Sequence, residues 1–155
     1  AAGGGWLFYQ LNQTARVYQA NDLYHFVGRP VADPEASDYR AWLADPLIDP
    51  PQKAVHGPFD IFDAGRYRVS FRIKTQDSVE EPARQIARLQ VNATANLDTL
   101  ITQPIRWEHF LRPDLYHDMV LTITNPRRQA LSFEVHYLGV APLVIDEVTI
   151  TKIGD

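Results

Sequence analysis

The segment from Gly65 to Lys74 constrains the fold of this chain more than any other part of the sequence. Its apolar side chains recur at every second position, and charged or polar side chains stand between them. The apolar positions are Tyr67, Val69, Phe71 and Ile73. A period of two predicts a β-strand with one buried face. We therefore expect strands of this kind to build the core.

Comparable alternation recurs along the chain, between connections rich in proline and glycine. It predicts strands over 15–21, 65–74, 87–93, 100–106, 117–124, 130–138 and 143–153. A short apolar run covers 39–44, and the prolines of 45–58 predict a long loop there. In the last strand the apolar parity changes at Asp146-Glu147, which indicates a β-bulge. Together these patterns predict an all-β fold, an antiparallel β-sandwich of the jelly-roll type.

Length, composition and charge exclude several classes of protein. The 155 residues, 45% hydrophobic and 22% charged, suit a single globular domain. The formal net charge is −4 and no basic run occurs, so nucleic acid is not an expected partner. No apolar stretch reaches the ~18 residues of a membrane span, and we expect no membrane insertion. Without cysteine, disulfides, thiolate metal sites and a cysteine nucleophile are excluded.

The sequence divides into two expected parts. Residues 1–14 begin with a glycine-rich tether and continue with the apolar segment Trp6-Leu7-Phe8-Tyr9, which we expect to dock on the domain or on a neighbour. Residues 15–155 form the sandwich domain. The chain starts without methionine, so we expect it to be a piece of a larger protein.

Four short stretches resemble, in the same order, the carbohydrate-binding modules of the galactose-binding-like jelly-roll superfamily. They are V-Y-Q-A-N-D-L at 17–23, A-V-H-G-P-F at 54–59, G-R-Y-R-V-S-F-R at 65–72 and L-V-I-D-E-V at 143–148. The likeness covers residues 15–153. It implies a non-catalytic module that recognises a glycan and is appended to a larger extracellular or cell-surface protein.

The resemblance also implies a structural calcium ion near one end of the sandwich. In the superfamily it is held by two acids of the opening strand, an Asp of the closing strand and backbone carbonyls. The corresponding positions are Gln19, Asn21 and Asp146. Two of them are amides, which offer an oxygen but no charge. We therefore expect weakened calcium affinity, or a hydrogen-bond network in place of the ion.

Sugar binding in such modules uses aromatic side chains in the loops at one edge of the sandwich. An aromatic ring offers a large apolar area at a low entropy cost. By loop position the candidates are Tyr39, Trp42, Trp107 and Tyr116, with Arg106, His109, His117 and Asn125 as polar partners. Core packing is an alternative role for Trp42 and Tyr116. The superfamily often has an Asn in the loop before the closing strand, whereas this chain has G-V-A-P at 139–142.

Two other interpretations compete with sugar binding through loop aromatics. The first is a structural or interaction domain without sugar binding, which docks on a larger enzyme such as a membrane-bound glycosyltransferase or self-associates through segment 6–9. The second is a surface for a polyanion or an acidic glycan, because basic side chains share one face of the strand 65–74. Those side chains are Arg66, Arg68, Arg72 and Lys74. Such a stripe is also the ordinary solvated face of an antiparallel sheet.

A small hydrolase or lyase is the weakest hypothesis. Glycoside hydrolysis needs two carboxylates that face each other across a cleft. The possible pairs are Asp114 with Asp118 and Asp146 with Glu147. Asp146 and Glu147 are neighbours, and neighbours in a regular strand point to opposite faces. Asp114 lies in a loop, where nothing orients it toward Asp118. The five histidines show no metal-ligand spacing. We therefore expect no enzyme activity.

Overall fold

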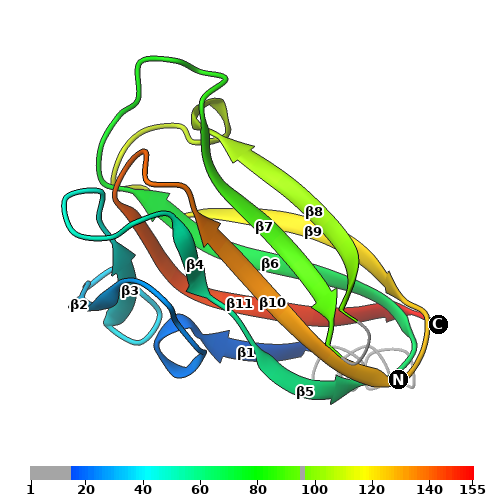
Figure 1. The fold of residues 1–155 in the computed structure, drawn as a ribbon. Coiled ribbons are helices and arrows are strands. Elements are labelled where there is room, and N and C mark those ends of the chain that lie inside the picture. Colours follow the sequence, from blue (N-terminus) through cyan, green and yellow to red (C-terminus); the bar gives the residue numbers. More distant parts are fainter. Residues whose placement is uncertain (1–14, 95–96) are drawn as a thin grey trace, which may run out of the picture.

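In the computed structural model, residues 15–94 and 97–155 are described, and they form two antiparallel sheets packed face to face (Figure 1). The six-stranded sheet has the order β2-β3-β11-β6-β9, and β1 also pairs with β11. The five-stranded sheet has the order β4-β10-β7-β8, and β5 also pairs with β10. The predicted antiparallel sandwich is confirmed. The predicted docking segment 6–9 lies outside the described residues.

In the described part of the chain, the strands follow one another with two short 3-10 helices between them. Their bounds are β1 (Ala15–Gln19), β2 (Arg29–Ala32), β3 (Arg40–Ala44), β4 (Gln52–Val55), β5 (Pro58–Phe62), β6 (Gly65–Thr75), β7 (Gln85–Ala93), β8 (Asp98–Arg106), β9 (His117–Asn125), β10 (Gln129–Tyr137) and β11 (Leu143–Gly154). The helices are η1 (Ala20–Asp22) and η2 (Trp107–His109). Within the described ranges, no helix is long and apolar enough to cross a membrane.

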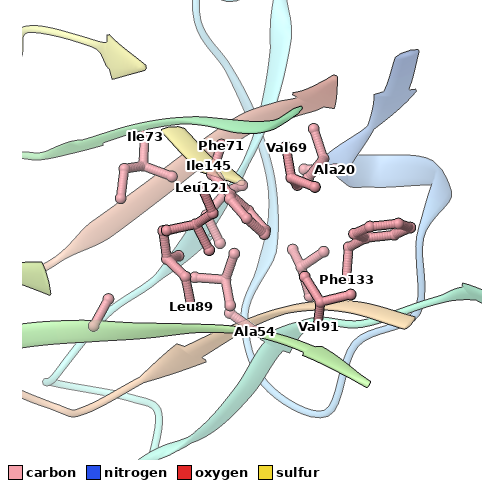
Figure 2. Packing of buried hydrophobic residues seen from close by; sticks show 14 of the residues in the cluster. Ala20, Ala54, Val69, Phe71, Ile73, Leu89, Val91, Leu121, Phe133 and Ile145 are labelled. Atoms are coloured by element: carbon pink, nitrogen blue, oxygen red, sulfur yellow. The ribbon is translucent and has the colours of Figure 1, made fainter. Parts of the chain in front are cut away.

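The core lies between the sheets and is built from the alternating positions. The four inward side chains predicted for β6 are at most 5% exposed. In Figure 2, Phe71 and Ile73 of the six-stranded sheet lie across the core from Leu89 and Val91 of the five-stranded sheet. The period of two therefore identified the buried face of each long strand correctly.

The predicted bulge in β11 is also confirmed, and it has a consequence for two carboxylates. The pairing of β11 with β6 shifts register between Ile145 and Glu147. The shift leaves both Asp146 and Glu147 in contact with the Ser37 hydroxyl. Our expectation that these neighbours point apart holds only for a regular strand, and it is wrong here because the bulge inserts an extra residue.

The sequence prediction fails at the short edge strands. Residues 45–58 are not one long loop, because they contain β4 and the start of β5, and β2 was not predicted at all. These strands have four or five residues, too few to show a clear alternation. Pro30 lies in an edge strand and Pro58 begins β5, positions at which a strand tolerates a residue without an N–H.

Candidate functional site

The connection from β8 to β9 brings four of the predicted binding residues together, Arg106, Trp107, His109 and His117. Trp107 stacks on the buried Phe110, with ring centroids 5.9 Å apart, and packs against the core. His109 Nδ1 accepts a hydrogen bond of 2.8 Å from the backbone N–H of Arg106. His117 Nε2 accepts one of 3.0 Å from a backbone N–H of the same connection. These contacts stabilise the conformation of the connection between β8 and β9.

A cavity of about 280 Å³ opens beside this connection, between the edge strands β8 and β9. Its lining is Gln103, Ile105, His109, Met119, Val120 and Leu121. Most of these side chains are apolar. Among the predicted polar partners, His109 alone lines this cavity.

The other predicted residues lie elsewhere on the sandwich. Tyr39 is 71% exposed at the turn between β2 and β3, and its φ of 55° is rare for a bulky residue. Trp42 stacks on His25, with centroids 3.4 Å apart, and its Nε1 donates to the carbonyl of Val27. Asn125 is buried and donates to two backbone carbonyls. Tyr39 is therefore the most exposed of the four aromatic side chains predicted to bind sugar.

Tyr116 lies in a polar network on the outer face of the six-stranded sheet. Arg72 and Lys74 lie 4.2 and 4.5 Å from its ring centroid. Its hydroxyl donates a 2.7 Å hydrogen bond to Asp33, which also forms an ion pair of 2.7 Å with Lys74. Burial raises the pKa of Tyr116, and the neighbouring carboxylate raises it further. The side chain of Lys74 is 8% exposed, so the expected solvated basic face is wrong at this residue.

The charge of Asp33 depends on these partners. Burial disfavours its ionised form, but the hydrogen bonds from Lys74 and Tyr116 outweigh burial and hold the pKa of Asp33 below its usual range. The carboxylate is therefore ionised at neutral pH. The resulting Lys74–Asp33–Tyr116 group anchors the segment that follows β2 to β6.

The predicted calcium positions converge in part on the Ser37 hydroxyl. Its oxygen lies 3.1 Å from Gln19 Oε1, 3.0 Å from Asp146 Oδ1 and 2.9 Å from Glu147 Oε2. A hydroxyl carries one proton and cannot donate to all three oxygens. Asn21 Oδ1 is buried and has no hydrogen-bond partner in the described part of the chain. Carboxylate and amide oxygens are what a hard cation prefers, so Gln19, Asp146 and Glu147 around Ser37 carry oxygens that suit calcium.

Arg72 supplies part of the positive charge that such a cation would bring. Its guanidinium donates to Asp146 Oδ2, and the side chain of Asp146 is 0% exposed. No cluster of three or more histidine or carboxylate residues that could hold a metal occurs among residues 15–94 and 97–155. The sequence analysis did not place Glu147 among the calcium positions, because its contact with Ser37 joins segments that are far apart in the sequence.

A group of exposed aromatic rings lies beside β4, and the sequence analysis did not identify it. We call it the aromatic edge, and it consists of Tyr24, Phe26, His56 and Phe59. Phe26 stacks on His56 at 4.7 Å between centroids, and Tyr24 lies 5.4 Å from Phe59. The tyrosine and the two phenylalanines are 56%, 62% and 39% exposed. Rings that contact one another and remain open to solvent form an apolar platform.

Backbone pairing positions the aromatic edge. Tyr24 and His56 exchange two backbone hydrogen bonds of 2.9 Å, which extends the sheet beyond β4. Side chains alternate across an extended segment, so Tyr24 and Phe26 share one side. Phe59 has a φ of 70°, and a Cβ on Gly57 would lie 2.8 Å from the Tyr24 ring. The positive φ of Phe59 is strained for a bulky side chain, and strain of this kind gathers at functional sites.

The ring of His56 is uncharged at neutral pH. Burial lowers its pKa, and the positive charge of Lys53 lowers it further. A neutral imidazole behaves as an aromatic ring, which suits its place in the aromatic edge.

A row of polar side chains continues from the aromatic edge across the five-stranded sheet. We call it the polar row, and it consists of Lys53, Arg88, Gln90, Glu134 and His136. His136 lies opposite Lys53 on β4 and opposite Arg88 on β7, and Glu134 lies opposite Gln90. Burial disfavours the charged form of Glu134, but the hydrogen bond from His136 and the charge of Lys53 outweigh it and lower its pKa.

These pKa shifts predict a loss of stability in acid that proceeds in two steps. Burial lowers the pKa of His25 and His56 in the folded protein below the ordinary value of about 6.5. The stability that these neutral rings support is therefore present above about pH 6.5 and is lost as the pH falls below it. The pKa values of Asp33 and Glu134 are lowered in the folded protein. Their ionised side chains therefore contribute stability above about pH 4, and this contribution is lost at lower pH. We expect urea unfolding to give a smaller free energy at pH 5 than at pH 8, and a further fall below pH 4. Equal free energies at pH 8 and 5 would contradict the histidine step.

The sequence matches no protein-family model and no curated protein. Solved structures do match, along almost the whole chain. A family 35 carbohydrate-binding module from Clostridium thermocellum is 9% identical with a TM-score of 0.62, and the match covers 90% of this chain and 99% of that one. The chain has the fold of the carbohydrate-binding modules. The jelly-roll prediction is therefore confirmed.

Two further modules with this fold were solved with bound sugars. One, from Cellvibrio mixtus lichenase 5A with cellotriose, is 12% identical with a TM-score of 0.58, over 91% of this chain and 99% of that one. The other, from Clostridium stercorarium with cellobiose, is 16% identical with a TM-score of 0.55, over 89% and 94%. At such identities the likeness shows the carbohydrate-binding-module fold.

Proposed function

We propose that the chain is a non-catalytic carbohydrate-binding module that holds a saccharide on the outer face of its five-stranded sheet. The observation that carries the proposal is the aromatic edge, whose exposed rings adjoin the polar row. A pyranose has apolar C–H faces and a rim of hydroxyls. Aromatic rings pack against the apolar face of the sugar, while charged and amide side chains form hydrogen bonds with its hydroxyls.

The structural neighbours support this proposal, because two of them were solved with cellotriose and cellobiose. One of these modules belongs to a larger enzyme, lichenase 5A. By the same comparison we propose that this chain is appended to a larger extracellular or cell-surface protein. We propose no catalysis, because Asp146 is paired with Arg72 and Glu147 is hydrogen-bonded to Gln19.

Replacing one ring of the aromatic edge tests where the sugar binds. We expect Phe26→Ala or Tyr24→Ala to weaken binding about five- to thirtyfold, the loss of about 1–2 kcal/mol for an aromatic contact. The ligand is chosen by screening neutral and acidic oligosaccharides on an array, with cellotriose included. Isothermal titration calorimetry then gives the dissociation constants.

The exposed Tyr39 and the half-buried Trp107 supply matched controls for this test. Tyr39→Ala and Trp107→Ala leave the affinity unchanged if the saccharide lies on the aromatic edge. A loss confined to these two variants would instead locate the saccharide in the loops and contradict the proposed site. No binding to any glycan on the array would contradict saccharide binding altogether.

Docking to another protein is a second candidate function for the same aromatic rings. Exposed apolar side chains that touch one another also mark protein interfaces. Sedimentation of the chain, alone and with other domains of its parent protein, distinguishes the two functions. Self-association or docking that Phe26→Ala abolishes, without glycan binding by the wild type, favours the interaction domain.

We also propose that calcium binds weakly beside Ser37. Gln19, Asn21 and Asp146 would hold the ion, together with Glu147. Bound there, the ion would neutralise the carboxylates and be coordinated by the oxygens to which the single Ser37 hydroxyl proton cannot donate. With a dissociation constant of about 0.1–1 mM, 10 mM calcium adds about 1–3 kcal/mol to the free energy of unfolding.

Thermal melting in calcium and in a chelator measures this contribution. We expect a higher midpoint in calcium for the wild type and no calcium response in Asp146→Asn. Magnesium serves as the control cation. Equal midpoints in calcium and chelator would contradict calcium binding, without bearing on the proposed sugar binding.

A further inference from the structure

Arg88, in the polar row, is oriented by a chain of hydrogen bonds. A guanidinium only donates, so its Nη2 donates the 3.0 Å hydrogen bond to His136 Nδ1. The proton of the neutral His136 ring therefore sits on Nε2, which donates to Glu134 Oε1 at 2.9 Å. Ser132 donates to the other oxygen of Glu134 at 3.0 Å. This chain fixes the position of the guanidinium on the outer face of the sheet.

The charge of Arg88 is not balanced within the described structure. Glu134, the carboxylate at the end of the hydrogen-bond chain, forms an ion pair with Lys53 and accepts a hydrogen bond from His136. Four arginines, Arg29, Arg72, Arg106 and Arg128, have carboxylate partners, and Arg88 is among those without one in the described part of the chain. Across residues 15–94 and 97–155, no carboxylate lies within ion-pair distance of Arg88.

Arg88 also lines a cavity. Its volume is about 210 Å³, and its lining is Pro51, Gln52, Arg88, His136, Tyr137 and Leu138. Pockets for drug-sized ligands begin at about 300 Å³, so this one has room for a small group such as a single sugar residue. The lining combines apolar carbon from the proline and leucine with an amide and a fixed positive charge. A compact ring that carries an anionic group matches this combination.

The cavity and the aromatic edge both lie near β4, which supplies Gln52 to the cavity and is followed directly by His56 of the aromatic edge. Gln52 of the cavity and His56 of the aromatic edge are four residues apart, at most about 13 Å along the chain. One short oligosaccharide can contact both. Its neutral residues would stack on the rings while one residue enters the cavity.

We propose that Arg88 binds the carboxylate of an acidic sugar residue, so that the module selects uronate-bearing glycans. This inference rests on the proposed saccharide binding and adds the class of ligand. The planar guanidinium presents paired N–H donors that match a carboxylate, and hydrogen bonds between charged groups are the strong ones. His136 and Glu134 position Arg88, and His136 also lines the cavity beside it.

Trisaccharides that differ only in charge test this selection. The ligands are trigalacturonate, trimannuronate and a glucuronate-bearing xylotriose, each compared by titration calorimetry with its uncharged methyl ester. We expect at least one acid to bind about ten- to hundredfold more tightly than its ester. We expect that preference to shrink with added salt.

Arg88→Gln removes the charge and keeps a donor for His136. We expect it to bind acid and ester equally, with the ester affinity of the wild type. Arg88→Lys should restore part of the preference, and the exposed Arg66→Gln on the other sheet should leave it intact. An unchanged melting midpoint shows that Arg88→Gln is folded.

The outcomes separate this inference from the proposed function. An acid preference that survives Arg88→Gln, or the absence of any preference in the wild type, overturns the role of Arg88. Binding of neutral sugars that depends on Phe26 then still supports the aromatic edge. Loss of all saccharide binding overturns both.

Discussion

Arg72→Ala is expected to lower the free energy of unfolding by about 3–5 kcal/mol, the usual cost of leaving one partner of a buried ion pair unpaired. The carboxylate that remains is Asp146, whose side chain is 0% exposed and keeps only Ser37 as a hydrogen-bond partner. Urea unfolding in chelator measures the loss. Arg72→Lys retains the charge and should lose less.

The same variant should become more dependent on calcium than the wild type. Arg72 and a cation both offer positive charge to Asp146, so removal of the arginine leaves more of that charge for the cation to supply. We expect calcium to raise the melting midpoint of Arg72→Ala by more than that of the wild type. A double variant, Arg72→Met with Asp146→Leu, should regain much of the stability and lose the calcium response. Stability of Arg72→Ala within about 0.5 kcal/mol of the wild type would contradict the proposed role of this pair.

Asp33→Ala is expected to cost a similar amount, about 3–5 kcal/mol, for the same physical reason. It leaves the ammonium of Lys74 buried without its carboxylate and removes the acceptor of the Tyr116 hydroxyl. Urea unfolding at pH 7 measures the change. Asp33→Asn keeps the shape and loses the charge, and it should lie between the wild type and Asp33→Ala.

A second substitution at Lys74 separates the charge from the packing. With Lys74→Met added to Asp33→Ala, no unpaired ammonium remains, and we expect most of the lost stability to return. The double variant should also show a smaller loss of stability below pH 4, because Asp33 no longer titrates. A double variant that is less stable than Asp33→Ala would show that Lys74 stabilises the sheet by packing rather than through its charge.

The long strands could be predicted because their burial pattern is local. β6, β7, β10 and β11 each carry inward apolar side chains at every second position, and the sandwich follows from that period. Even the bulge at Asp146 was visible as a change of parity. The short strands β2 and β4 were not predicted, because four residues at a sheet edge depend on the partner strand more than on their own pattern.

The surfaces were harder to predict, because they depend on which segments meet. Tyr24 and His56 are far apart in the sequence, and a backbone bridge between them assembles the aromatic edge. Tyr116 and Trp42 looked like loop aromatics, and the structure packs one against Arg72 and Lys74 and the other against His25. The Y-H-F run at 24–26, with aromatic rings on one side of an extended segment, was a usable local signal.

By itself, the sequence determined the all-β class, the buried faces of the long strands and the position of the bulge in β11. These features follow from side-chain periodicity within one segment. Only the tertiary structure decided that Arg72 reaches Asp146 and that three oxygens surround the Ser37 hydroxyl. It also decided that Arg88 lines a small cavity and has no carboxylate partner among the described residues. Charge pairing and exposure are set by strands distant in sequence, and no local pattern encodes them.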